Sequence, residues 1–233
     1  EVQDTICKKY EAVWKQIAER FAKYDEHLIF ESMNEEFDGE YSDPNPDYYA
    51  NLNHYNQIFV DTVRATGENN THRWLLVPGW NTNIQYTVGD YGFEMPTDGS
   101  CSAGENRLML SVHYYDPWDY CGTENIKTYL WGEKGDELVS AGLNQKAVAS
   151  WGREDYLDEQ FQTLKEQYVD KQIPVIIGEY GAIDKSTADS NHVGEIQSNR
   201  VYFNGYVAGA AASRGIIPVY WDNGANSVYG FGV

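Results

Sequence analysis

The sequence is short of positive charge and of long apolar runs. Its 233 residues include 17 Lys and Arg against 36 Asp and Glu, which gives a formal net charge of −19. A chain of this charge repels the phosphates of nucleic acids and of anionic membrane surfaces, so we expect neither as a partner. Because no window of about 18 apolar residues occurs, a membrane-spanning helix is not expected either.

Phosphate-binding fingerprints are missing and cysteine is scarce. Neither GxGxxG nor GxxxxGK occurs, which argues against a nucleotide cofactor. Of the three cysteines, Cys101 and Cys121 flank one polar stretch and could pair across a loop, which would leave Cys7 over. Each cysteine could equally be a free buried thiol, and the sequence leaves both interpretations open.

Aromatic side chains, by contrast, are abundant, with 19 Tyr, 8 Phe and 7 Trp. One interpretation is a tyrosine-rich core. The other is a surface that stacks on flat, uncharged, hydroxylated ligands. Composition alone does not choose between the two.

Helical and strand patterns alternate along the chain. Apolar periodicity predicts helices over residues 8–24, 48–64, 153–171 and 193–213. Apolar runs predict strands over 28–33, 74–77, 108–115, 173–177 and 216–221, with long polar loops at 80–105 and 116–152. Such nearly continuous apolar strands are typical of parallel sheets covered on both faces. The alternation predicts an α/β fold, either a barrel or a doubly wound sheet.

Polar or flat residues stand at the end of every predicted strand. They are Asn34 and Glu35, Trp80, His113 to Tyr115, Glu179, and Trp221 to Asn223. In a (β/α) barrel these strand ends meet at one mouth, which holds the active site. Taken singly, Glu35 could be a solvated surface acid, and His113 or Trp221 could belong to the core. Glu179 is more telling, because an apolar strand carries it inward and burying an unpaired acid costs several kcal/mol.

Two facing carboxylates beside flat aromatic rings are the groups that glycoside hydrolysis uses. One carboxyl protonates the leaving oxygen, and the other attacks the anomeric carbon or activates water. A separation of about 5–5.5 Å between the carboxyls would give retention of configuration.

Four stretches resemble motifs of glycoside hydrolase family 5. They are residues 28–35 for the acid/base strand, 113–115 for the sixth-strand H-x-Y, 176–181 for the nucleophile strand and 219–224 for the eighth strand. Residues 75–83, 89–93 and 151–156 are similar to endoglucanases of subfamily 4, especially those of anaerobic rumen fungi. The resemblance covers essentially the whole chain.

The resemblance implies roles for five strand-end residues. Glu35 would be the acid/base, and Glu179 would be the nucleophile of a retaining double displacement. Asn34 would bind the 2-hydroxyl of the sugar in subsite −1, and His113 would contact the same sugar. Tyr115 would donate a hydrogen bond to Glu179 and help keep it ionised. This chemistry needs no metal and no cofactor.

The resemblance also implies a substrate. Trp221 would be the stacking floor of subsite −1, with Trp80, Trp118 and Asn223 as further candidates for the cleft. The expected activity is endo-acting hydrolysis of cellulose-like β-1,4-glucan polysaccharide or oligosaccharide by a secreted, extracellular enzyme. Alternatives are a related β-glycanase acting on xyloglucan, mixed-linkage glucan, xylan or mannan, or a non-catalytic glycan-binding fragment.

The family fold is a (β/α)8 TIM barrel, and the matched motifs cover about strands 4 to 8. Strands 1 to 3 and the last helix have no counterpart in the sequence. We therefore expect residues 1–233 to form a single catalytic (β/α) barrel domain that is partial. The remainder would be a missing N-terminal part of the barrel or would come from a complementing chain.

Overall fold

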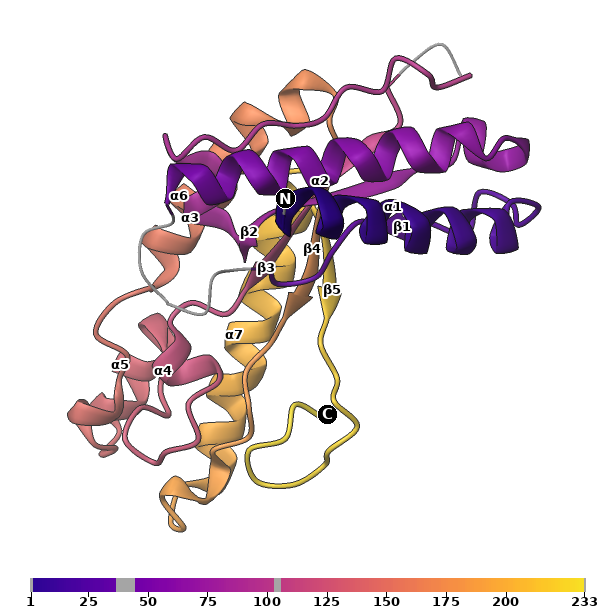
Figure 1. Cartoon of the computed structure of the whole chain (residues 1–233). Helices are drawn as coiled ribbons and strands as arrows, with labels where there is room; N and C mark the ends of the chain where they lie inside the picture. The colour runs from indigo at the N-terminus through magenta and orange to yellow at the C-terminus, as the bar shows by residue number, and fades with distance from the viewer. Residues whose placement is uncertain (1, 37–44, 103–105, 233) are drawn as a thin grey trace. The chain divides into compact units, whose positions relative to one another are not determined.

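The computed structural model describes residues 2–36, 45–102 and 106–232 (Figure 1). Helices and strands alternate along these ranges, which gives the expected α/β class. The chain forms two compact units. Unit 1 is Glu1–Val112 with Gln172–Pro174, and unit 2 is His113–Lys171 with Val175–Val233. The expectation of one domain over residues 1–233 stays a prediction.

Unit 1 contains two long helices and the first strands. Its elements are α1 (Val2–Phe21), β1 (Phe30–Glu31), α2 (Pro46–Ala65), η1 (Glu68–Thr71), β2 (Leu75–Asn83), α3 (Ile84–Val88) and the start of β3 (Leu108–Tyr114). β1 and β2 are parallel, with Phe30 opposite Leu75, and β3 is the other neighbour of β2. Helices α1 and α2 pack side by side (Figure 1).

The core of unit 1 forms where these helices meet the strands. Trp14 and Ala18 are the buried side of α1, and the Trp14 ring meets the Phe59 ring of α2 edge-on at 4.4 Å. Both pack with Phe30 and Leu75 in one apolar cluster. Removing these large rings from water is the main stabilisation available to the unit.

Buried Arg73 closes the turn between α1 and β1. Its guanidinium donates to the carbonyl oxygens of Phe21, Tyr24, Asp25 and Leu28 at 2.6–3.2 Å. Four carbonyl oxygens of this turn thus converge on one guanidinium, which satisfies buried acceptors. Arg73 thus fixes where β1 begins and where the residues after it emerge.

Unit 2 holds the second parallel strand pair. Its elements are the end of β3, α4 (Trp118–Cys121), α5 (Gly132–Ser140), η2 (Gln145–Ala147), α6 (Glu154–Gln167), η3 (Val169–Lys171), β4 (Val175–Tyr180), η4 (Ser186–Ala188), α7 (Val193–Ser213) and β5 (Ile217–Tyr220). β4 and β5 run parallel. Helix α7 packs against β5, and the segment after β5 continues as a long loop (Figure 1).

Two of the predicted loop boundaries are wrong. β2 does not end at residue 77, as predicted, but runs to Asn83, because Asn81 N donates to Glu36 O and extends the pairing with the residues after β1. Residues 80–105 also contain α3.

The predicted loop 116–152 contains α4, α5 and η2. The sequence does not predict helix α5, because it contains Gly132 and Gly135 and glycine is a poor helix former. Close packing favours glycine at position 135, since a Cβ there would lie only 3.3 Å from the Leu130 Cβ.

All three cysteines are free thiols, so the alternative of a Cys101–Cys121 disulfide is not realised. Among the described residues, no helix is both long and apolar enough to cross a bilayer.

Candidate functional site

Glu179 lies near the end of β4, in a one-residue bulge. Between the pairs Ile177–Pro218 and Tyr180–Tyr220, β4 advances by three residues while β5 advances by two. Bulges re-aim a side chain out of strict alternation, and they are common beside active sites. Here the bulge leaves the Glu179 side chain 17% exposed at the end of an otherwise apolar strand.

Two side chains from the end of β3 meet the Glu179 carboxylate. The Tyr115 hydroxyl donates to Glu179 Oε2 at 2.9 Å, and His113 Nδ1 lies 3.6 Å from the same oxygen. The expected hydrogen bond between Tyr115 and Glu179 is therefore present.

The Tyr115 ring is braced by two further aromatic rings. Trp118 meets it edge-on at 6.0 Å, and Phe231 meets it at 5.9 Å. Phe231 is seated by Arg200, whose guanidinium donates to Phe231 O at 2.7 Å, and by Gly181, where a Cβ would lie 3.1 Å from the Phe231 ring. Neither Phe231 nor Arg200 is predicted from the sequence, because nothing in their local sequence signals a contact with a strand end so distant in the chain.

The two remaining candidates of unit 2 follow β5. Trp221 N donates to Tyr180 O, so Trp221 stays beside β4, and this residue is 40% exposed. Asn223 Oδ1 accepts from Ala225 N and from Phe231 N, both at 3.1 Å. Through these two bonds Asn223 Oδ1 stabilises the loop that carries Phe231. The expected contact between Asn223 and a sugar stays a prediction.

Asn34 and Glu35 follow β1 in unit 1, and both are exposed. The backbone on either side of them is fixed, because Ser32 N donates to Leu76 O and Asn81 N donates to Glu36 O. The pair is thus held at the carboxyl end of β1, where the sequence predicts it, and its roles stay predictions.

A network of side-chain hydrogen bonds connects the end of β1 to helices α1 and α2 and to β2. The Tyr10 hydroxyl oxygen lies 2.7 Å from Ser32 Oγ. Ser32 Oγ in turn donates to Asn56 Oδ1, and Asn56 Nδ2 donates to Pro78 O. Burial raises the pKa of Tyr10 to about 12, so this phenol remains a neutral donor throughout the range in which enzymes work.

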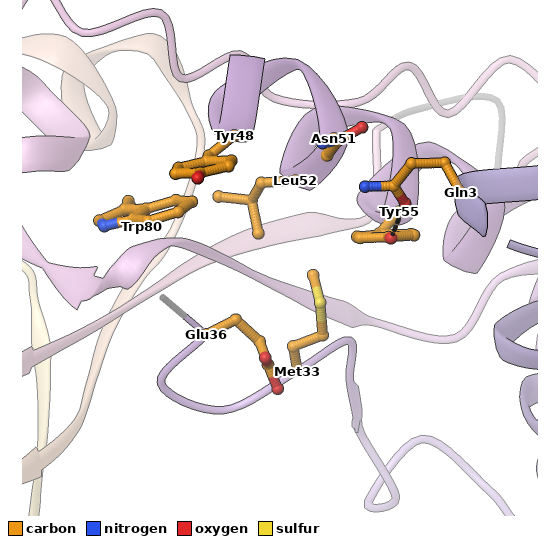
Figure 2. A pocket seen from close by; sticks show the side chains of 8 residues that line it. All are labelled: Gln3, Met33, Glu36, Tyr48, Asn51, Leu52, Tyr55 and Trp80. Atoms are coloured by element: carbon orange, nitrogen blue, oxygen red, sulfur yellow. Dashed lines mark hydrogen bonds between the residues drawn. The ribbon is translucent and has the colours of Figure 1, made fainter. Parts of the chain in front are cut away.

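Trp80 lies in the wall of a pocket of about 240 Å³ in unit 1, not on an open surface. The lining side chains, drawn in Figure 2, are Gln3, Met33, Glu36, Tyr48, Asn51, Leu52, Tyr55 and Trp80. Trp80 is only 6% exposed and stacks nearly parallel on Tyr48, with 5.7 Å between ring centroids. The pocket therefore has an apolar floor with amide and carboxylate groups among its lining side chains.

The helix that carries Trp118 is anchored by buried Lys185. Lys185 is 3% exposed, and its Nζ donates to the carbonyl oxygens of Asp119 at 2.6 Å and Thr128 at 2.9 Å. Ile183 N adds a hydrogen bond to Cys121 O. Burial lowers the pKa of the Lys185 ammonium from 10.5 to about 8.

The lowered pKa of Lys185 gives a testable dependence of stability on pH. Between about pH 8 and 10.5 the unfolded chain holds a proton that the folded chain has lost, so this lysine makes stability rise with pH in that window. We expect the free energy of unfolding of the wild type, minus that of Lys185→Met, to grow from pH 8 to 10. The growth is at most about 1.4 kcal/mol per pH unit. Urea titrations at four pH values measure it.

The solvent-exposed Lys127, which precedes the Thr128 that Lys185 contacts, provides the matched control. With Lys127→Met the difference from wild type should stay flat across this pH range. If the difference in free energy of unfolding between wild type and Lys185→Met stays flat or falls with pH, the pKa of Lys185 is not lowered in the folded protein.

The family model described as cellulase (glycosyl hydrolase family 5) matches residues 1–227. Endoglucanase A of Paenibacillus barcinonensis is 50% identical over 233 residues, which cover 98% of this chain and 56% of that protein. A xyloglucan-specific endo-beta-1,4-glucanase of Bacteroides ovatus is 35% identical over 231 residues, which cover 95% of this chain and 42% of that protein. The chain spans about half the length of the curated relatives it matches.

Solved structures of family 5 enzymes also match this chain. A family 5 xyloglucanase from Paenibacillus pabuli in complex with ligand has a TM-score of 0.91 and 49% identity, covering 99% of this chain and 62% of that chain. A GH5-4 broad specificity endoglucanase from Bacteroides salanitronis has a TM-score of 0.84 and 38% identity, covering 99% and 57%. The prediction of a partial (β/α)8 TIM barrel is confirmed.

Proposed function

Because the chain belongs to the cellulase family, glycosyl hydrolase family 5, we propose that it carries the catalytic pair of a retaining endo-β-1,4-glucanase. Glu179 is the nucleophile and Glu35 the acid/base. The observation that carries the proposal is the setting of Glu179, which a strand bulge presents and which Tyr115 and His113 meet at a single carboxylate oxygen. A surface acid would need none of these partners.

Each carboxyl has a separate task in the proposed reaction. Glu179 attacks the anomeric carbon while Glu35 gives its proton to the departing oxygen, which leaves a glycosyl ester on Glu179. Glu35 then takes a proton from water as that water attacks the same carbon, and Glu179 is released. Asn34, next to Glu35, is placed to bind the sugar's 2-hydroxyl, a contact that strengthens in the transition state.

The proposed substrate is a neutral β-1,4-glucan chain. Xyloglucan is the second candidate, because several similar proteins are named for it, including structures in complex with a XXXG heptasaccharide and with XXLG. We also propose membership of subfamily 4, on the likeness to endoglucanases described as GH5-4, and secretion, because such polymers lie outside the cell.

One face of β5 exposes apolar side chains that the rest of a barrel would cover. In β5 the residues Ile217 and Val219 and the following Trp221 are exposed in alternation. Such an apolar stripe on a strand is a surface that other polypeptide normally covers. We propose that it packs against the remainder of the barrel, either in the same protein or in a complementing chain.

The test is a reducing-sugar assay on cellulose, mixed-linkage glucan, xyloglucan, xylan and mannan. The chain is assayed alone and together with the part of the Paenibacillus barcinonensis endoglucanase that lies outside the match. We expect cleavage of β-1,4-glucans, with NMR showing products that first appear as the β-anomer. Inversion would refute the double displacement, and inactivity on every polymer in both forms would refute the hydrolase.

A further inference from the structure

Among the described residues, the hydrogen-bond acceptors around the buried guanidinium of Arg200 are all neutral. Arg200 lies on α7 and is 8% exposed. Its nitrogens donate at 2.7–3.2 Å to Ala182 O, to Phe231 O, to Gly232 O and to the Tyr220 hydroxyl. Burying a cation without an anionic partner costs free energy that these bonds must offset. The three segments that Arg200 joins are the residues after β4, strand β5 and the end of the chain's final loop.

The final loop, residues 222–232, is also tied to the segment that follows β4. Tyr229 N donates to Asp184 O at 2.8 Å, and Asp184 N donates to Gly230 O at 2.9 Å. Phe231 N donates to Asn223 Oδ1 at 3.1 Å within the loop. Together with the buried guanidinium, these bonds hold the backbone of Phe231 in one place.

The Phe231 ring contacts the segments that carry both partners of one hydrogen bond. A Cβ on Gly181 would lie 3.1 Å from the ring, so Phe231 packs directly on the backbone two residues beyond Glu179. The same ring meets the Tyr115 ring at 5.9 Å with 68° between the planes. Tyr115 donates to Glu179 Oε2 at 2.9 Å. Phe231 therefore lies where it can set the spacing between donor and acceptor.

The direction of the Glu179 carboxylate depends on this hydrogen bond. Glu179 lies in a bulge, where regular strand pairing is interrupted. The other neighbour of the same oxygen, His113 Nδ1, lies at 3.6 Å, which is beyond hydrogen-bond distance. The Tyr115 hydroxyl is thus the closer restraint of the two. A misplacement of about 1 Å in a reacting group can cost about 10²-fold in rate.

We propose that Phe231, held in place by Arg200, is a positioning residue that sets the Tyr115–Glu179 hydrogen bond and so orients the Glu179 carboxylate for attack. This inference rests on the proposed function for the role of Glu179 as nucleophile. Phe231 and Arg200 act through Tyr115 and are assigned no contact with the sugar.

The first test needs no turnover. 3-Fluorotyrosine is placed at position 115 alone, and its fluorine NMR resonance is compared with and without Glu179→Gln. The substitution makes a charged acceptor neutral, so the resonance should move in the otherwise unchanged protein. With Phe231→Ala present, the response to Glu179→Gln should be much smaller, because the ring no longer holds the hydroxyl at the carboxylate.

Two milder variants guard against loss of the fold. Phe231→Leu keeps an apolar side chain against Gly181 and should give an intermediate response. Arg200→Lys keeps the charge, but an ammonium lacks the planar fork that reaches acceptors on three segments at once, so its response should also be reduced.

Tyr206→Ala is the matched control. It removes a half-buried ring of unit 2 that packs at 5.6 Å on Trp131 and lies outside the final loop. The full response to Glu179→Gln should persist in this variant. The inference is overturned if Phe231→Ala responds as strongly as the control, or if Glu179→Gln leaves the resonance of the otherwise unchanged protein unmoved.

The second test measures the reaction with an activated aryl cellobioside, on the form of the protein that is active in the polymer assay. Phe231→Ala should lower kcat by about 10–10²-fold with KM nearly unchanged, because it displaces a reacting group and removes no contact with the substrate. Adding Phe231→Ala to Tyr115→Phe should cost little more than Tyr115→Phe alone, since both act on one hydrogen bond. Additive losses, or a wild-type kcat in Phe231→Ala, would overturn the inference.

The proposed function and this inference fail in different ways. If the chain hydrolyses nothing in any form but loses the NMR response in Phe231→Ala, the hydrolase is refuted and the spacing role of Phe231 stands. If the protein hydrolyses glucan and Phe231→Ala keeps the full response, the positioning role is refuted and the hydrolase stands.

Discussion

Replacing Glu179 by Ala is expected to abolish turnover, even of an activated aryl cellobioside whose leaving group needs no proton. The loss in kcat should be on the order of 10⁴ or more, because no other described side chain of unit 2 replaces a carboxylate that forms the glycosyl ester. Initial rates of phenolate release, measured on the form of the protein that is active in the polymer assay, give the result.

The isosteric Glu179→Gln variant should be equally inactive while it keeps the fold, since an amide oxygen can still accept from Tyr115 at the position that Glu179 Oε2 occupies. The exposed Glu159 of α6 supplies the control, because Glu159→Gln removes a charge from the same unit without touching the site. Residual activity above about one percent in Glu179→Ala would remove Glu179 from the role of nucleophile.

The strand ends are the part of the site that sequence could locate. A buried strand is short and apolar, so polar side chains near its carboxyl end are conspicuous, as with Asn34 beyond β1 and His113 near the end of β3. The position of Glu179 was found for the same reason. The bulge that aims it was not, because a bulge depends on the register with a second strand, and only Gly178 hints at it in the sequence.

Contacts that join distant segments account for the rest. Phe231 reaches Tyr115 only because Arg200 of α7 and Asn223 after β5 hold the final loop in place. The exposure of Trp80 likewise depends on Tyr48, a residue of another helix, which covers it. Local propensity describes each segment separately and carries no information on such pairs, so the sequence does not predict that Tyr48 covers Trp80. A sugar contact by Trp80 stays a prediction.

In the predicted loops, too, local sequence failed where tertiary packing determines the structure. Helix α5 and the far half of β2 were missed where glycine and proline interrupt the local pattern, and tertiary packing overrides that pattern at Gly135 and at Asn81. Weak local signals of this kind are decided by packing in the folded chain.

Replacing Glu35 by Ala separates the two steps of the proposed reaction. With a polymer, kcat/KM should fall by a factor of about 10²–10⁴, because the departing sugar oxygen is left without a proton donor. With 2,4-dinitrophenyl cellobioside the first step should proceed at nearly the wild-type rate, since that phenolate leaves unprotonated. The second step should still be slow, because no base activates the water.

Pre-steady-state kinetics make this asymmetry visible. Glu35→Ala should release a burst of dinitrophenolate equal to the enzyme concentration and then turn over slowly, with the glycosyl ester detectable by mass spectrometry on the peptide that contains Glu179. Azide, a nucleophile that needs no base, should speed the slow phase and yield a β-glycosyl azide. The exposed Glu26 of unit 1 gives the control, since Glu26→Ala should retain wild-type rates on both substrates. Equal loss on the activated and the natural substrate would show that Glu35 acts in another way, and the two carboxylates would have to exchange or share their assigned roles.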